Sequence, residues 1–292
     1  MLLVRVAFGI GEGFENGAQF KLISEHFDER ERSQASAIFL SALALGPAVA
    51  TPAAAWLIRS LGWRHMFFLF AIPGVIVAAL LWIFLPTEVA NSEEVEPPTT
   101  ADVVRALRNP ACAWSACGYL LFNATFWGFL GWVPTYLTVQ HQMDISKMGL
   151  LGAIPYAAGF VGMLVSGRIG TTSLRAFRPV LAGVCYLGAG VFLFLAMKAS
   201  AVGFCIAGLS ATAFFLYGSF GPFWGFAIGL SKPELRGGLT GSVNFFGQVG
   251  GFSAQILVGV LTDRMHSFDG AIIFMSASSI LAAVAMLLAQ RS

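Results

Sequence analysis

Two ionisable residues, Arg5 and Glu12, lie seven positions apart in the first apolar segment of the chain. Seven residues correspond to about two helical turns, so both side chains would lie on nearly the same face, roughly 10 Å apart along the axis. A charge inside a membrane is costly and is kept mainly where it faces a partner or a water-filled path. The pair therefore predicts a path for an anion and a proton. The alternative is that both charges only hold neighbouring helices together.

The composition places these residues in an integral membrane protein. The chain is 57% hydrophobic and 11% charged, whereas soluble domains are about 25% charged. The net charge of +2 is too small to indicate nucleic-acid binding. The four cysteines form no CxxC pair, which argues against a zinc site or a disulfide framework. No His/Asp/Ser cluster suggests hydrolysis, and we expect neither an enzyme nor a bound cofactor.

Apolar runs of bilayer-spanning length predict nine membrane helices. They cover roughly Leu2–Ile23, Gln34–Ile58, Met66–Leu85, Ala113–Val139, Met148–Gly167, Pro179–Lys198, Ala201–Leu230, Leu239–Leu261 and Gly270–Ala289. Small residues allow membrane helices to approach closely, and we expect that role for Gly159, Gly162, Gly247, Gly250 and Gly251.

The connections between these spans alternate in positive charge. Eleven Lys and Arg residues fall on one side and five on the other, and the richer side is expected in the cytoplasm. This orientation places the C-terminus inside and Met1 outside. The acidic, proline-containing stretch 86–110 reads as a cytoplasmic linker between a partial bundle, residues 1–85, and a six-helix bundle, residues 111–292.

Several motifs follow one another in a characteristic order. They are RVAFGIGEG at 5–13, ERERSQA at 29–35, LGPA at 45–48, GWRHMF at 62–67, WVPTYL at 132–137, GPFW at 221–224 and NFFGQVGGF at 244–252. Together they resemble the major facilitator superfamily, and within it the anion:cation symporters that carry organic acids. The resemblance covers the whole chain and begins at that family's fourth helix.

The resemblance implies an all-α polytopic membrane fold, with about nine of the family's twelve helices present. Transporters of this kind are built from repeats of three helices, so we expect three more helices before Met1 and no transport by these 292 residues alone. The implied location is the bacterial inner (plasma) membrane, with the lipid bilayer as the surrounding partner.

The implied function is proton-coupled uptake of small organic anions by alternating access, with sodium as the alternative coupling ion. Sugar acids, dicarboxylates and aromatic acids remain open as substrates. Family members use the motif arginine as a carboxylate clamp, so Arg5 would bind the anion, since a guanidinium forks onto a carboxylate. Glu12 would carry the proton.

Further substrate contacts are expected from polar and aromatic side chains within apolar helices: Asn123, Trp224, Asn244 and Gln248. Amides can bind hydroxyl groups or bond a neighbouring helix instead, and a tryptophan can pack rather than line a cavity. The alternatives for the whole protein are an exporter of the same fold and a non-transporting membrane fragment.

Overall fold

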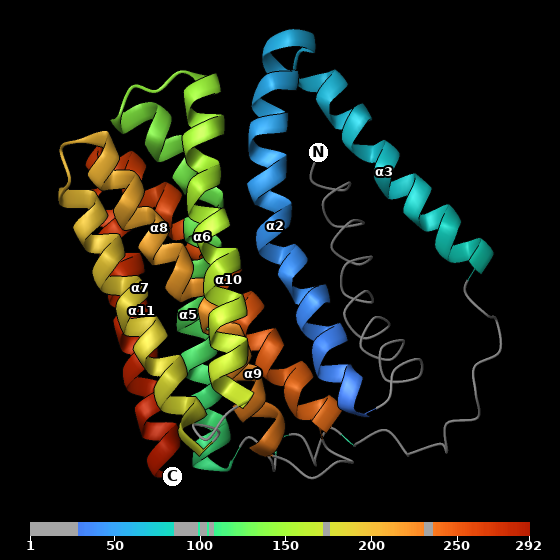
Figure 1. The fold of residues 1–292 in the computed structure, drawn as a ribbon. Helices are drawn as coiled ribbons and strands as arrows, with labels where there is room; N and C mark the ends of the chain where they lie inside the picture. Colours follow the sequence, from blue (N-terminus) through green and yellow to red (C-terminus); the bar gives the residue numbers. More distant parts are fainter. Residues whose placement is uncertain (1–28, 85–98, 100–103, 105–107, 172–175, 231–235) are drawn as a thin grey trace.

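The computed structural model describes residues 29–84, 99, 104, 108–171, 176–230 and 236–292. Within these residues the chain is helical and contains no strand. The helices are α2 (Glu29–Leu61), α3 (Trp63–Phe84), α5 (Pro110–Gln140), α6 (Ile145–Thr171), α7 (Arg178–Lys198), α8 (Val202–Gly218), α9 (Phe220–Ala227), the 3₁₀ turn η2 (Ile228–Leu230), α10 (Arg236–Met265) and α11 (Asp269–Arg291). Figure 1 shows α5 to α11 gathered in one bundle, with α2 alongside and α3 diverging from it.

Eight stretches of the described chain are long and apolar enough to cross a membrane. They coincide with the last eight of the nine predicted spans, whereas the first, Leu2–Ile23, lies outside the described residues. The predicted span Ala201–Leu230 is built from α8, α9 and η2 in succession. Proline lacks an N–H group and clashes with the carbonyl four residues earlier. Pro222 therefore accounts for the break between Gly218 and Phe220.

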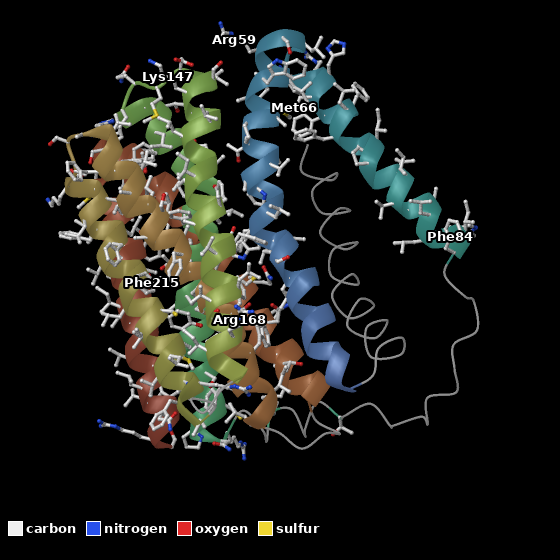
Figure 2. The ribbon with its side chains drawn as sticks, viewed as in Figure 1. Arg59, Met66, Phe84, Lys147, Arg168 and Phe215 are labelled. Atoms are coloured by element: carbon white, nitrogen blue, oxygen red, sulfur yellow. The ribbon has the colours of Figure 1, made fainter. Side chains whose placement is uncertain are left out.

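In the bundle, helices that are neighbours in sequence are often not neighbours in space. Along the bundle, α10 packs on α5, α5 on α11, α11 on α7, α7 on α8, and α8 on α6. Helix α2 packs along the outer side of α6, while α3 contacts chiefly α2. The side chains of α3 are almost all exposed, up to 90% for Trp82, and Figure 2 places Phe84 at its far end, away from the bundle.

Glycines bring α10 against α5 and α6 against α8. A Cβ atom on Gly250 would meet the backbone of Leu120, and one on Gly251 would meet the ring of Trp127. A Cβ atom on Gly162 would likewise meet the backbone of Phe214. The predicted role of these glycines in close helix contact is confirmed, as it is for Gly159 against Tyr217 and Gly247 against Tyr119.

Polar side chains tie the same helices together through backbone carbonyls. The Thr125 hydroxyl donates to the Met275 carbonyl at 2.7 Å, joining α5 to α11. The Ser279 hydroxyl donates to the Tyr186 carbonyl at 2.7 Å, joining α11 to α7. The Gln255 amide donates to the Trp127 carbonyl at 2.6 Å, joining α10 to α5. Without water, a polar side chain must find its partner within the protein.

Replacing Gly250 with alanine should destabilise the protein, because the new methyl group would press on the Leu120 backbone, 2.8 Å from its carbonyl carbon. Overpacking of this kind costs about 1–3 kcal/mol. Gly241→Ala on the same helix is the matched control, since a Cβ atom there meets nothing within 4 Å. Thermal unfolding in detergent should show a lower midpoint for Gly250→Ala than for Gly241→Ala. Equal midpoints would contradict the close contact.

Candidate functional site

The six predicted site residues divide into two groups. Arg5 and Glu12 lie outside the described residues. The other four lie on three helices: Asn123 on α5, Trp224 on α9, and Asn244 and Gln248 on α10. Because α10 packs on α5, the structure brings part of this second group together.

The centre of the group is Asn123, a buried amide that is 2% exposed. Its Nδ2 atom donates to the Tyr119 carbonyl one helical turn earlier, at 2.9 Å. A Cβ atom on Gly247 would lie 2.8 Å from Nδ2 and 2.5 Å from the ring of Tyr119. The amide and the phenol ring therefore occupy the space that a side chain at position 247 would need.

Tyr119 joins Asn123 to Trp224. Its phenol interacts with both of their side chains. Its ring stacks on Phe223 with centroids 4.5 Å apart and meets the Trp224 ring edge-on at 5.2 Å. The sequence prediction did not include Tyr119. The signal for it was its position one turn before Asn123 on the same helix face.

Asn244 and Gln248 lie one helical turn apart on α10, and Gly247 lies between them in sequence. Asn244 is half-buried, whereas Gln248 is exposed. Trp224 is also half-buried, so its ring both packs on Tyr119 and keeps an accessible part. We call Tyr119, Asn123, Trp224 and Gly247 the amide–aromatic cluster; Asn244 and Gln248 lie next to Gly247 on α10.

The cluster offers neutral hydrogen-bonding groups and aromatic faces. All the buried polar side chains of the described chain are uncharged: Ser115, Asn123, Thr125, Ser166, Thr212, Ser219, Ser276, Ser278 and Ser279. In the described part, no group of three or more His, Cys, Asp or Glu residues could hold a metal ion. Amides and a phenol donate and accept hydrogen bonds without a fixed charge, so this arrangement suits hydroxyl groups better than a carboxylate.

A separate cavity of about 430 Å³ lies at the other end of α5. Gln140, Thr262, Asp263 and His266 contribute to its lining. Gln140 ends α5 and the other three lie at the end of α10 and in its connection to α11. None of the predicted site residues lines this cavity.

The family and the proteins that this chain resembles are all transporters. The family described as Major Facilitator Superfamily matches residues 1–255. The Escherichia coli (strain K12) protein named "Probable galactarate/D-glucarate transporter GarP" is 29% identical over 98% of this chain and 71% of its own length. The "Hexuronate transporter" of Bacillus subtilis (strain 168) is 22% identical over 98% of this chain and 72% of its own. The "D-galactonate transporter" of Escherichia coli O6:H1 is 26% identical over 98% and 73%.

Solved structures give a similar fold at low identity. A bacterial homologue of the human lysosomal transporter Spinster, in an inward-facing and unoccupied conformation, matches with a TM-score of 0.58 at 14% identity. It covers 94% of this chain and 72% of that one. The inward-facing and occupied form matches with a TM-score of 0.55 at 15% identity, over 94% and 71%.

Proposed function

We propose, from the premise that the chain belongs to the Major Facilitator Superfamily, that this integral membrane transporter takes up sugar acids with protons by alternating access. It is a transporter rather than an enzyme, with helices of membrane-spanning length, and we place it in the inner membrane of a bacterium. The observation that carries the proposal is the agreement of its relatives. Their names specify galactarate or D-glucarate, hexuronate and D-galactonate.

Those substrates share a carboxylate and a hydroxylated carbon chain, and the residues of this protein match both parts. The neutral amides Asn123, Asn244 and Gln248 would bind hydroxyl groups. The Trp224 ring would cover an apolar face of the substrate. Arg5 would hold the carboxylate through two parallel hydrogen bonds. Recognition of the charge would then come from one half of the chain and recognition of the hydroxyls from the other.

Glu12 is the proposed proton carrier. A carboxylate binds and releases a proton when its surroundings change between two states. In a helix, the seven-residue separation from Arg5 would place Glu12 two turns away and allow the anion and the proton to affect one another through a local field. Protons are the proposed coupling ion, and sodium is the alternative. An exporter of the same fold would use the same pair in the opposite direction.

The proposed alternating access requires two helices that separate during the cycle. We assign this contact to the end of α2 and the start of α6, which lie on the side predicted to face outward. We treat residues 1–85 and 111–292 as two bundles joined by the linker 86–110, so α2 and α6 belong to different bundles. At this end the Arg59 Nη1 atom donates to the Ser146 hydroxyl at 2.9 Å, and Gly149 faces Ala55. Figure 2 places Arg59 and Lys147 at the same end of the molecule.

The start of α6 is fixed locally at this contact. The Asp144 carboxylate accepts hydrogen bonds from the backbone N–H groups of Ser146 and Lys147, at 2.9 and 3.0 Å. These bonds, with the nearby charges of Lys147 and Arg59, hold the pKa of the Asp144 carboxyl below its usual value. The turn that presents Ser146 to Arg59 is therefore ordered by a charged N-cap.

The uptake experiment uses full-length protein in liposomes, with labelled galactarate outside and an inward pH gradient. We expect accumulation in the wild type that a protonophore abolishes. Glu12→Gln cannot cycle a proton, so counterflow exchange of galactarate should persist while pH-driven accumulation disappears. If Glu12→Gln still concentrates substrate with protons, the coupling carboxylate lies elsewhere. Absence of counterflow in the wild type would favour a non-transporting protein. Gradient-driven efflux of galactarate from loaded vesicles would instead favour an exporter.

Arg5→Lys tests the carboxylate clamp separately. Lysine keeps the positive charge but loses the planar fork, so galactarate affinity should fall. A charge-assisted hydrogen bond contributes roughly 1.5–3 kcal/mol, which is about one to two orders of magnitude in binding. Competition by the neutral sugar alcohol galactitol is the control, because it has the hydroxyls without the carboxylates. A lysine variant with unchanged galactarate affinity would remove Arg5 from the site.

Cross-linking tests the contact between the two bundles. A Cβ atom on Gly152 would lie 3.8 Å from Thr51 Cγ2, so the double variant Thr51→Cys/Gly152→Cys should form a disulfide on oxidation. We expect the disulfide to stop uptake and a reductant to restore it. The control pair Gly183→Cys/Met286→Cys joins α7 to α11 within one bundle, where a Cβ atom on Gly183 lies 3.6 Å from Met286 Cβ. That control cross-link should leave uptake intact. If the Thr51→Cys/Gly152→Cys cross-link also left uptake at the level of the reduced protein, it would argue against separation of α2 from α6.

A further inference from the structure

Arg178 makes a long-range contact that the proposed function does not use. Its guanidinium Nη1 atom donates to the Gly225 carbonyl at 2.8 Å, across 47 residues of sequence. Arg178 begins α7, and Gly225 follows Trp224 in α9. We propose that Arg178 is a positioning residue, which holds α9 so that Trp224 stays against Tyr119. This inference rests on the proposed function of the amide–aromatic cluster.

Helix α9 is supported at its start and needs a partner at its C-terminal end. Its 8 residues follow α8 across Ser219, where the Ser219 and Phe223 N–H groups donate to the Phe215 and Ser219 carbonyls at 3.1 and 2.9 Å, so α8 supports the beginning of α9. Its inner face packs through Phe220 and Phe223, both buried. At its C-terminal end the helix gives way to the 3₁₀ turn η2, where carbonyl groups lack the usual helical partners. A cation at a helix C-terminus is favourable because it can donate hydrogen bonds to these carbonyls and because it interacts favourably with the helix dipole.

The arginine and the glycine fit one another closely. A Cβ atom on Gly225 would lie 3.0 Å from Cζ of Arg178 and 3.1 Å from both Nε and Nη1. These three short distances show that the guanidinium borders the space that a Cβ atom at position 225 would occupy. A side chain at position 225 would therefore push the guanidinium away by a few tenths of an ångström and stretch its hydrogen bond. The site is half-buried, so the bond is less exposed to competition from water than a surface contact.

The consequence for transport follows from the neighbouring residue. Trp224 precedes Gly225 by one position, and its ring meets Tyr119 edge-on at 5.2 Å. Loosening the end of α9 would move the ring relative to Tyr119 and Asn123. Substrate affinity should then fall while the maximal rate, which depends on movement of the two bundles, changes little.

Three variants probe the contact in the full-length protein. Arg178→Met removes the donor and keeps an unbranched apolar stem, Gly225→Ala keeps the arginine but displaces it, and Arg178→Lys keeps a cation and a donor. Arg291→Met is the matched control, because Arg291 is an exposed arginine in the last turn of α11. Gly241→Ala controls for the general effect of alanine on a helical glycine, which is otherwise stabilising.

Amide hydrogen exchange of residues 220–230 gives a readout that does not require transport. We expect faster exchange in Arg178→Met and Gly225→Ala than in the wild type, and no change in Arg291→Met or Gly241→Ala. Arg178→Lys should lie between the wild type and Arg178→Met. Unchanged exchange in both Arg178→Met and Gly225→Ala would overturn the proposal, whatever the transport activity.

The kinetic readout separates positioning from general stability. For galactarate uptake, we expect Arg178→Met and Gly225→Ala to raise KM by about tenfold, equivalent to about 1.4 kcal/mol, with maximal rates within about twofold. In a Trp224→Phe background the same substitutions should have little further effect, because coupled residues are non-additive. A full rise in KM in that background, or a loss confined to the maximal rate, would overturn the proposal. If wild-type protein carries no sugar acid, the proposed function fails, and hydrogen exchange alone decides whether Arg178 holds α9.

Discussion

The close approach of α10 to α5 is the contact on which the candidate site depends. Lipid tails are as apolar as the helix surfaces, so the helices gain by close packing rather than by escape from water. At Gly250 the approach brings α10 against the Leu120 backbone, and at Gly247 it leaves room for Tyr119 and Asn123. The lack of a side chain therefore allows close helix packing at Gly250 and leaves space for the polar cluster at Gly247, about one turn away. A larger residue at position 247 would remove the site and the contact together.

The buried polar side chains of the described bundle are all uncharged, and this sets what its interior can recognise. Hydroxyl side chains such as Thr125 and Ser279 are satisfied by carbonyls of neighbouring helices. The Asn123 amide donates one N–H to the Tyr119 carbonyl on its own helix, and its side chain also interacts with the Tyr119 phenol. The remaining capacity suits neutral hydroxyls. A sugar acid would therefore need its charge neutralised from outside this bundle, and Arg5, which the sequence predicts to lie within the membrane, is the proposed residue for that role.

The sequence was sufficient to predict the eight described spans and the role of the five glycines, because hydropathy and small residues reflect constraints that act locally on each helix. It was not sufficient for Tyr119, whose importance depends on facing Gly247 from another helix. The contact between Arg178 and Gly225 spans 47 residues, so no local pattern indicates it. Pro222 itself indicates a break in the helix before it. The sequence does not indicate that the Gly225 carbonyl would then meet Arg178, because that contact depends on tertiary packing.

The two faces of α6 differ in how easily they could separate. Toward α8, a Cβ atom on Gly162 would overlap the Phe214 backbone, and Tyr217 fills the space beside Gly159. Opening that face would expose the Phe214 backbone and the Tyr217 ring. Toward α2, the contact at the outer end consists of small side chains and the exposed bond from Arg59 to Ser146, which costs little to exchange for water. Packed interfaces move as rigid units rather than deform continuously. If the protein changes between two states, α6 should therefore stay with α8 and part from α2.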